Sequence, residues 1–265
     1  MTPAQPPDGG KPATTLLRFE AVGFRYPCAL EACISGLSLD VPEGWRCGLI
    51  GDNGCGKTTL FLLANGLLRP QQGQLRWREA PIRYARGSLR RLRQQVGLVF
   101  QNPEHQLVAT TVEEDLSFGL VNLGLDEAEI RRRMQQAAET FGLEALLERP
   151  THMLSMGQKK SLSLADVMVL EPELLLLDEP TAYLSPGHGR ALLQQLQRIH
   201  ASGTTILVAS HDMEFLNSWA DWLFVIEGGR LVLEGTPADI FARRDQLEAL
   251  NLGVPPSLDH SLIRR

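Results

Sequence analysis

The sequence lacks any apolar run long enough to cross a membrane as a helix. A spanning helix needs roughly 18 or more consecutive apolar residues, and none of the 265 residues lie in such a run. The first fifteen residues are rich in proline and glycine and lack the apolar stretch of a secretory signal peptide. We therefore predict a disordered leader over 1–15, and we expect that a partner must hold the protein if it works at a membrane.

Cysteine and positive charge are also scarce. The four cysteines show neither a redox C-x-x-C pair nor zinc-ligand spacing, which favours a reducing cytosol; they are Cys28, Cys33, Cys47 and Cys55. The net charge of -5 gives no electrostatic reason to expect a nucleic-acid partner. With 43% apolar and 22% charged residues, the composition is that of a globular protein with a large core.

Short apolar runs alternate with helical patterns along the chain, and this alternation predicts an α/β fold with a largely parallel sheet. The runs are continuous rather than alternating, which indicates strands buried on both faces; they cover 47–50, 96–100, 174–177 and 204–209. Polar or glycine residues follow each run. In open α/β sheets, ligands bind at the carboxyl ends of the strands.

Other segments depart from this pattern. The segments 16–44 and 73–84 resemble short alternating strands and predict an antiparallel side sheet. The charged, helical segment 112–147 lies between two predicted core strands, so we expect an inserted helical subdomain there. The segment 222–235 predicts a hairpin that turns at Gly228 and Gly229, and two prolines, Pro255 and Pro256, predict a loose C-terminal tail.

The most specific motif is the run Gly-Asp-Asn-Gly-Cys-Gly-Lys-Thr-Thr at 51–59. It fits the phosphate-loop pattern and stands between a predicted strand and a predicted helix. Glycines let backbone N–H groups approach a phosphate, and the helix adds its N-terminal dipole. We expect Lys57 to reach the β and γ phosphates and Thr58 to bind Mg²⁺. The predicted nucleotide contacts of this loop are Asn53, Gly54, Gly56, Lys57, Thr58 and Thr59.

Four leucines at 174–177 lead into Asp178 and Glu179. A carboxylate at the end of a buried strand can hold Mg²⁺, which predicts a metal role for Asp178. Glu179 is placed to orient or deprotonate an attacking water as a catalytic base. On its own, such a run is usually a strand reaching the surface, but a phosphate loop upstream favours the catalytic interpretation.

The run Leu-Ser-Met-Gly-Gln at 154–158 is a third candidate phosphate element. Ser155, Gly157, Gln158 and the following helix N-terminus can bind a γ-phosphate. A second anion site is redundant within one subunit and makes sense if it faces the nucleotide of another subunit. The alternative is an ordinary helix cap at Ser155.

Together these motifs resemble the ATPase subunits of ABC transporters, over about 16–241. The resemblance implies a P-loop NTPase core of the RecA-like type, with a parallel sheet, an antiparallel β side sheet and an inserted helical subdomain at about 103–165, followed by a tail over 242–265. It also implies ATP binding and hydrolysis by a dimer at the cytoplasmic face of the membrane. DNA-repair or ribosome-acting ABC ATPases are disfavoured, since the chain lacks a long coiled-coil insertion and a second ATPase domain.

Further positions match this family in order. Tyr26 corresponds to the aromatic residue that stacks on adenine, although it could instead pack within the side sheet. Gln101 corresponds to the Q-loop glutamine, which contacts Mg²⁺ or water. His211 corresponds to the switch histidine at the γ-phosphate and is expected to be catalytic, although a lone histidine is more often structural.

A narrower resemblance, over 101–107 and 111–119, is to the energy-coupling-factor ATPases of the cobalt and nickel type. It implies import, a transmembrane scaffold protein and a separate membrane protein that binds the substrate. Vitamin uptake is a close alternative. The acidic residues Glu113, Glu114 and Asp115 could meet a basic partner or could simply favour a helix N-terminus.

The chain departs from the family pattern at Met156, which replaces a signature glycine, and at Ser185, which replaces an aspartate of the D-loop. Lys160 and Ser161 replace the usual basic pair after the signature. These changes leave open a weakly hydrolysing regulatory subunit, and a homodimer or a heterodimer with a paralogue. We also expect the thiol of Cys55, near a helix N-terminus, to have a lowered pKa.

Overall fold

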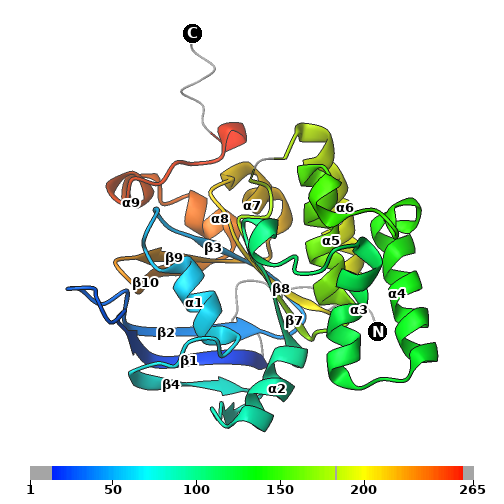
Figure 1. Cartoon of the computed structure of the whole chain (residues 1–265). Coiled ribbons are helices and arrows are strands. Elements are labelled where there is room, and N and C mark those ends of the chain that lie inside the picture. Colours follow the sequence, from blue (N-terminus) through cyan, green and yellow to red (C-terminus); the bar gives the residue numbers. More distant parts are fainter. Residues whose placement is uncertain (1–13, 183, 259–265) are drawn as a thin grey trace. The chain divides into compact units, whose positions relative to one another are not determined.

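The computed structural model describes residues 14–182 and 184–258, and the chain forms two compact units (Figure 1). Unit 1 combines the chain up to Arg93 with the chain from Thr205 onward, and unit 2 comprises 94–204. Residues 1–13 of the predicted leader lie outside the described residues, and the first strand already begins at Thr15. Unit 2 extends beyond the predicted helical subdomain of about 103–165 because it also contains two strands and a further helix.

Unit 1 contains the antiparallel side sheet that the sequence predicts. Its strand order is β2 (Ile34–Pro42), β1 (Thr15–Phe24), β4 (Gln72–Trp77) and β5 (Ala80–Pro81), with every pairing antiparallel. Leu17, Phe19 and Val41 are buried, whereas the neighbouring Arg18, Glu20 and Asp40 are partly exposed and charged. This alternation is the pattern of a sheet with one packed face.

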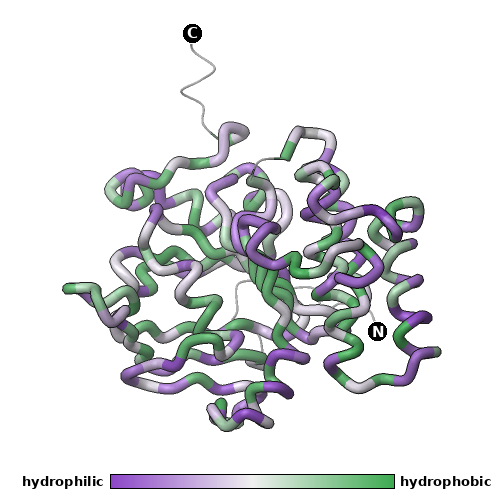
Figure 2. The backbone as a smooth tube through the Cα atoms, viewed as in Figure 1, coloured by the Kyte–Doolittle hydropathy of each residue, from purple (hydrophilic) through white to green (hydrophobic). Residues whose placement is uncertain are grey.

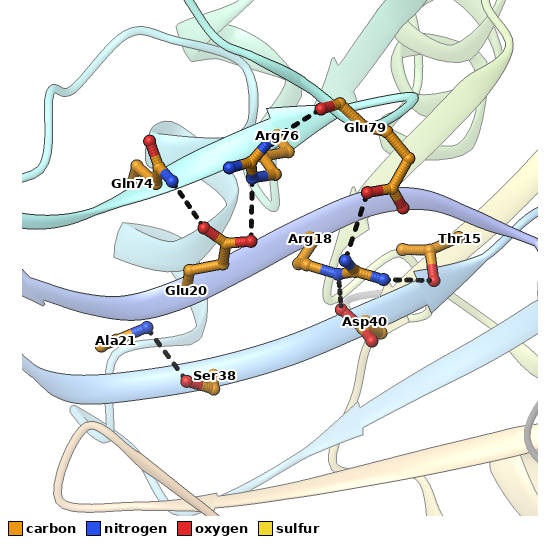
Figure 3. A network of polar contacts seen from close by, with 9 residues as sticks. All are labelled: Thr15, Arg18, Glu20, Ala21, Ser38, Asp40, Gln74, Arg76 and Glu79. Atoms are coloured by element: carbon orange, nitrogen blue, oxygen red, sulfur yellow. Dashed lines mark hydrogen bonds and ion pairs between the residues drawn. The ribbon is translucent and has the colours of Figure 1, made fainter.

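A network of polar and charged side chains covers the polar face of the side sheet (Figure 3). Arg18 donates to Asp40 at 2.8 Å, and Arg76 pairs with Glu20 at 2.8 Å. Hydrogen bonds from Gln74 and Arg76 lower the pKa of Glu20. The network supports cross-strand pairing rather than a ligand site, because opposite charges on these strands satisfy one another.

A second sheet in unit 1 positions the phosphate loop. Its strands run in the order β10 (Arg230–Gly235), β9 (Trp222–Glu227), β3 (Arg46–Ile50) and β8 (Thr205–Ala209). Strand β3 is parallel to β8 and β9, while β9 and β10 form the predicted antiparallel hairpin. The backbone of the central strands is coloured as hydrophobic in Figure 2, and β3 and β8 confirm two of the predicted apolar runs. Helices α1 (Lys57–Ala64) and α7 (Met213–Trp219) begin a few residues after β3 and β8.

The C-terminal part of unit 1 corrects one prediction. The segment predicted to be a loose tail contains α9 (Arg244–Ala249) and a short 3-10 helix, η4 (Pro256–Leu258), after α8 (Pro237–Phe241). Leu247 and Leu252 are buried, and the backbone N–H of Ser257 donates to Glu214. Both buried leucines precede the two prolines, and the contact between Ser257 and Glu214 holds the chain after them. Residues 259–265 lie outside the described range. Much earlier in the chain, α2 (Arg86–Gln95) follows the side-sheet strand β5 and is strongly basic.

Unit 2 pairs two parallel strands with helices. Strand β6 (Val96–Val99) pairs with β7 (Leu174–Asp178), as their predicted burial suggested. Between them in sequence lie α3 (Val112–Leu123), α4 (Glu127–Phe141) and α5 (Met156–Met168), which pack on one another and confirm the predicted helical insertion. Helix α6 (Pro186–Ala201) follows β7. Three 3-10 helices connect these elements; they are η1 (Pro103–His105), η2 (Glu144–Leu146) and η3 (Thr151–Met153). No helix among the described residues combines the length and apolarity of a membrane span.

Candidate nucleotide site

The phosphate loop of unit 1 begins where β3 ends. A side chain at Gly51 would lie 2.5 Å from the thiol of Cys55 and from the carbonyl of Ile226, so the loop folds tightly against β9. Gly54 and Gly56 have φ values of +80° and +108°, which a residue with a Cβ rarely adopts. The loop therefore requires glycine at these positions, and α1 starts directly after it.

Lys57, the first residue of α1, is buried with its ammonium group over the loop. Its Nζ donates to the carbonyl oxygens of Gly51 at 2.7 Å and Asp52 at 3.0 Å. Thr58 is exposed at the start of the same helix. The structure thus brings a fixed cation, a helix N-terminus and an exposed hydroxyl together, as the sequence predicts.

Thr59 and Tyr26 contact each other, a pairing that the sequence did not suggest. The hydroxyl of the buried Thr59 lies 3.2 Å from the Tyr26 hydroxyl and 3.2 Å from the Cys33 thiol. The Tyr26 ring packs edge-on against Phe24 at 5.0 Å, and 38% of the residue remains exposed. The predicted contact between Thr59 and nucleotide therefore competes with a structural role, whereas Tyr26 keeps an exposed ring surface for stacking.

The structure brings together two predicted residues that are 158 positions apart in sequence. His211 follows β8, and its Nε2 lies 3.0 Å from Oδ1 of Asn53 in the phosphate loop. With Oδ1 as acceptor, Nε2 carries the proton. Asp212 caps α7 by accepting from the N–H of Phe215, which fixes the chain just after the histidine. His211 therefore lies beside the loop rather than merely at the end of a strand.

Cys55 corrects the predicted thiol reactivity. The residue is buried in the loop, and burial raises the pKa of its thiol despite the neighbouring Lys57, which acts in the opposite direction. The helix N-terminus was expected to favour the thiolate, but desolvation dominates here. The thiol is a packing group beneath Gly51.

Unit 2 carries the remaining predicted residues. Asp178 ends β7 and is buried, and Glu179 follows it with a φ of +45°, in the left-handed region that side chains rarely adopt. The strand thus delivers two carboxylates to one edge, and the backbone turns sharply at the second. Sharp turns of this kind are often found where a side chain must be aimed at a reacting group.

The candidate signature forms a capped helix start. Ser155 is the N-cap of α5, and its hydroxyl accepts from the N–H of Gln158 while the Gln158 side chain accepts from the N–H of Ser155. This is the ordinary cap that the sequence left open as the alternative. Met156 remains 38% exposed at this end of the helix. The two side chains hold each other in place and leave the helix N-terminus available to an anion.

His188, which the sequence reasoning missed, lies next to this segment. A Cβ on Gly157 would lie 2.7 Å from Cδ2 of His188. The Nδ1 atom of His188 lies 2.7 Å from the hydroxyl of Ser185, the residue that replaces a D-loop aspartate. A motif search can identify Ser185 from the sequence. It cannot identify His188, because the contact between His188 and Gly157 exists only in the folded structure.

Gln101 is exposed after β6, and the segment that follows it is tied to α5. The side chain of Gln106 donates to the carbonyl of Ser163 at 2.5 Å and accepts from the N–H of Phe100 at 3.4 Å. Asn102 caps the short helix η1. Gln106 thus fixes the backbone on both sides of the predicted Q-loop residue.

The acidic cluster after this segment serves the helix that it begins. Glu114 forms a capping box with Thr111, and Asp115 is buried and accepts from the N–H groups of Val108 and Ala109. These contacts favour the structural alternative for two of the three residues. Glu113 remains exposed.

The arrangement can hold a polyphosphate in unit 1 and can supply carboxylates for a metal and a water in unit 2. Backbone N–H groups, a buried lysine and an exposed hydroxyl suit an anion. Buried and strand-end carboxylates suit Mg²⁺ and general-base chemistry. Within the described residues, no group of three or more histidine, cysteine or acidic side chains forms a metal site of its own.

Comparison with known proteins agrees with this chemistry. The family model described as "ABC transporter" matches residues 34–182. An ABC transporter ATP-binding protein of Nostoc sp. is 58% identical over 91% of this chain and 88% of its own length. The energy-coupling factor transporter ATP-binding protein of Methanocaldococcus jannaschii is 40% identical over 88% of this chain and 83% of its own.

One solved structure is similar over nearly its whole length. It is CbiO1 of Clostridium perfringens, described as part of the ABC transporter complex CbiONQ. The two chains share 37% identity with a TM-score of 0.80, over 94% of this chain and 99% of the other.

Proposed function

The chain belongs to the ABC transporters as an ATP-binding, ATP-hydrolysing subunit, and from this premise we propose that it energises an energy-coupling-factor importer. The observation that supports this most directly is the phosphate loop, where glycines at +80° and +108° precede the buried Lys57. The resemblance of 101–119 to the energy-coupling-factor group, and the similar relatives of that group, support the narrower part of the proposal.

We propose that this chain binds ATP through the phosphate loop. Gly54, Gly56 and the N-terminus of α1 would cradle the phosphates, and Lys57 would exchange its loop carbonyls for phosphate oxygens. Asn53 would contact the nucleotide from the loop. The exposed face of Tyr26 would stack on adenine.

The residues present also fit Mg²⁺, which prefers oxygen ligands. Thr58 and Asp178 would hold the ion, together with Gln101, because the first two present a hydroxyl and a carboxylate at the ends of strand–loop connections. When bound, the ion neutralises charge on the phosphates. Thr59 is the weakest member of the predicted set because its hydroxyl already contacts Tyr26 and Cys33.

Catalysis is assigned to two residues. Glu179 would accept a proton from the attacking water, and His211 would contact the γ-phosphate from its place beside Asn53. Ser155, Gly157 and Gln158 would close over the nucleotide of a second ATPase subunit, because a helix N-terminus favours a γ-phosphate. A homodimer carries two equivalent sites of this kind, and a heterodimer with a paralogue is the alternative.

The proposed partners place the chain at the cytoplasmic face of the membrane. A transmembrane scaffold protein would bind the ATPase dimer, and a separate membrane protein would bind the cargo. Cobalt or nickel is the proposed cargo, supported by the motif resemblance and by the similarity to CbiO1. No nucleic-acid partner is proposed, because the net charge of -5 does not favour binding to a polyanion.

The proposal is tested by Mg²⁺-dependent ATP turnover measured against protein concentration, with Glu179→Gln beside the wild type. Turnover that rises with concentration and disappears in the variant supports a self-sufficient dimer with Glu179 as base. ATP binding without turnover at any concentration supports the regulatory-subunit alternative.

The cargo is tested with the complete transporter in proteoliposomes, loaded with ATP and supplied with radiolabelled cobalt or nickel. ATP-dependent accumulation that is lost in Glu179→Gln supports the proposal. Transport of a vitamin instead of either metal would overturn the cargo assignment and leave the ATPase assignment intact.

A further inference from the structure

Lys160 reaches from the signature helix to the backbone of the proposed catalytic base. It lies on α5, five residues after the N-cap Ser155, and 9% of the residue is exposed. Its Nζ donates to the carbonyl of Pro180 at 2.8 Å and to that of Glu179 at 3.4 Å. A buried lysine whose ammonium donates to two backbone carbonyls of one turn has a specific positional role.

The carbonyls that it binds are the two that directly follow the Cα atom of a residue in a sparsely populated backbone conformation. Glu179 has a φ of +45°, and the next residue, Pro180, has no N–H with which to support the turn. The direction of the Glu179 side chain is set by this φ. A contact that holds the two carbonyls therefore also holds the direction of the carboxylate.

We propose that Lys160 is a positioning residue that holds Glu179 in its productive backbone conformation and ties it to the signature helix. The inference rests on the proposed function, in which Glu179 is the catalytic base. It adds a hydrogen-bonded link, within one subunit, between the helix that begins at the signature segment and the base that would serve the subunit's own nucleotide.

The charged groups around Lys160 do not draw its ammonium away from the turn at Glu179. The Glu179 carboxylate is the charged group that acts on its ammonium. Neighbouring ionisable groups have other partners: Lys159 pairs with Glu104 of η1 at 2.6 Å, and Asp166 shares a hydrogen bond with Asp115 of α3. On α4, Arg133 pairs with Glu129 and Glu171, and β6 carries no charged residue.

The test compares Lys160→Met with Lys160→Arg in the full-length protein. Lys159→Met is the matched control, because Lys159 is the neighbouring lysine of the same helix but pairs with Glu104. Both kcat and the affinity for ATP are measured, the latter by equilibrium binding. We expect Lys160→Met to lower kcat by roughly 10- to 100-fold, the size of effect that small misplacements of catalytic groups produce. The affinity for ATP should remain within about twofold, because the phosphate loop lies in the other unit. Lys160→Arg should restore most of kcat, since it keeps a charged donor.

Wild-type kcat in Lys160→Met overturns the proposal. A parallel loss of kcat and ATP affinity, equal in the Met and Arg variants, also overturns it, because that pattern reports a general structural defect. If Lys160→Met does not fold, Lys160→Gln, which keeps one donor, takes its place and is judged by the same two criteria. The Glu179→Gln variant distinguishes failure of the proposed function from failure of this inference. Turnover in Glu179→Gln overturns the proposed function. An inactive Glu179→Gln together with a fully active Lys160→Met overturns only the role of Lys160.

Discussion

The buried ammonium of Lys160 makes a prediction about stability that is independent of catalysis. Burial lowers the pKa of this side chain from 10.5 to about 8, against a smaller opposite effect of Glu179. The folded state therefore releases the proton more readily than the unfolded chain does. Replacing Lys160 with methionine removes the charge while keeping the length and much of the volume of the side chain.

The sign and size of the effect follow from the linkage between proton binding and folding. Below pH 8 the lysine is charged in both states, so the desolvation penalty is present in full, and it corresponds to roughly 3 kcal/mol. Between pH 8 and 10.5 the unfolded chain holds the proton and the folded chain does not, so wild-type stability gains with pH. Lys160→Met has no such gain. It also leaves the carbonyls of Glu179 and Pro180 without their donor, at a cost of about 1–3 kcal/mol.

We therefore expect Lys160→Met to be close to the wild type in stability at pH 7, where the two effects offset each other. At pH 10 it should be less stable by roughly 2–3 kcal/mol. Guanidinium denaturation of both proteins at pH 7, 8, 9 and 10 measures this difference, and Lys159→Met controls for the loss of a neighbouring lysine that pairs with a carboxylate. A stability difference between wild type and Lys160→Met that does not change with pH would refute the reasoning.

Three further predictions concern groups that take no part in the proposed chemistry. Burial and the neighbouring Asp115 raise the pKa of Asp166 well above its ordinary value, so the folded protein loses stability as the pH rises and this carboxyl must ionise. The melting temperature of Asp166→Asn should therefore be higher than that of the wild type at pH 8 and similar to it at pH 4. Iodoacetamide at pH 7.5 should label the exposed Cys28 at least about tenfold faster than the buried Cys55, as peptide mass spectrometry would show, and equal rates would contradict the burial of Cys55. Gly73→Ala should destabilise the side sheet by roughly 2–4 kcal/mol in a denaturant titration, because its φ is +67° and a Cβ would collide with backbone carbonyls of the adjacent strand; wild-type stability would contradict this.

The sequence predicted the elements with strong local signals. Continuous apolar runs marked β3, β6, β7 and β8, and the structure confirms each within about one residue at either end. The hairpin turned where two consecutive glycines allowed positive φ values. These features succeed because strand burial and turn chemistry are set by neighbouring residues.

Predictions that depended on burial or on distant partners were less reliable. The Cys55 thiol was expected to have a lowered pKa from its place near a helix N-terminus, but the depth of the loop against β9 reverses the direction. The C-terminal segment contained prolines that suggested a loose tail, whereas Leu247 and Leu252 are buried. Both errors arose because desolvation depends on elements far away in the sequence.

The sequence by itself determined the chemistry of the site, because a phosphate loop, a strand ending in two carboxylates and a capped signature helix are each local patterns with local physical causes. The tertiary structure decided which groups meet. It placed His211 against Asn53, His188 against Gly157 and the ammonium of Lys160 against the carbonyls at Glu179. Such contacts join residues from separate elements, so their existence depends on how strands and helices pack, and no spacing along the chain encodes it directly.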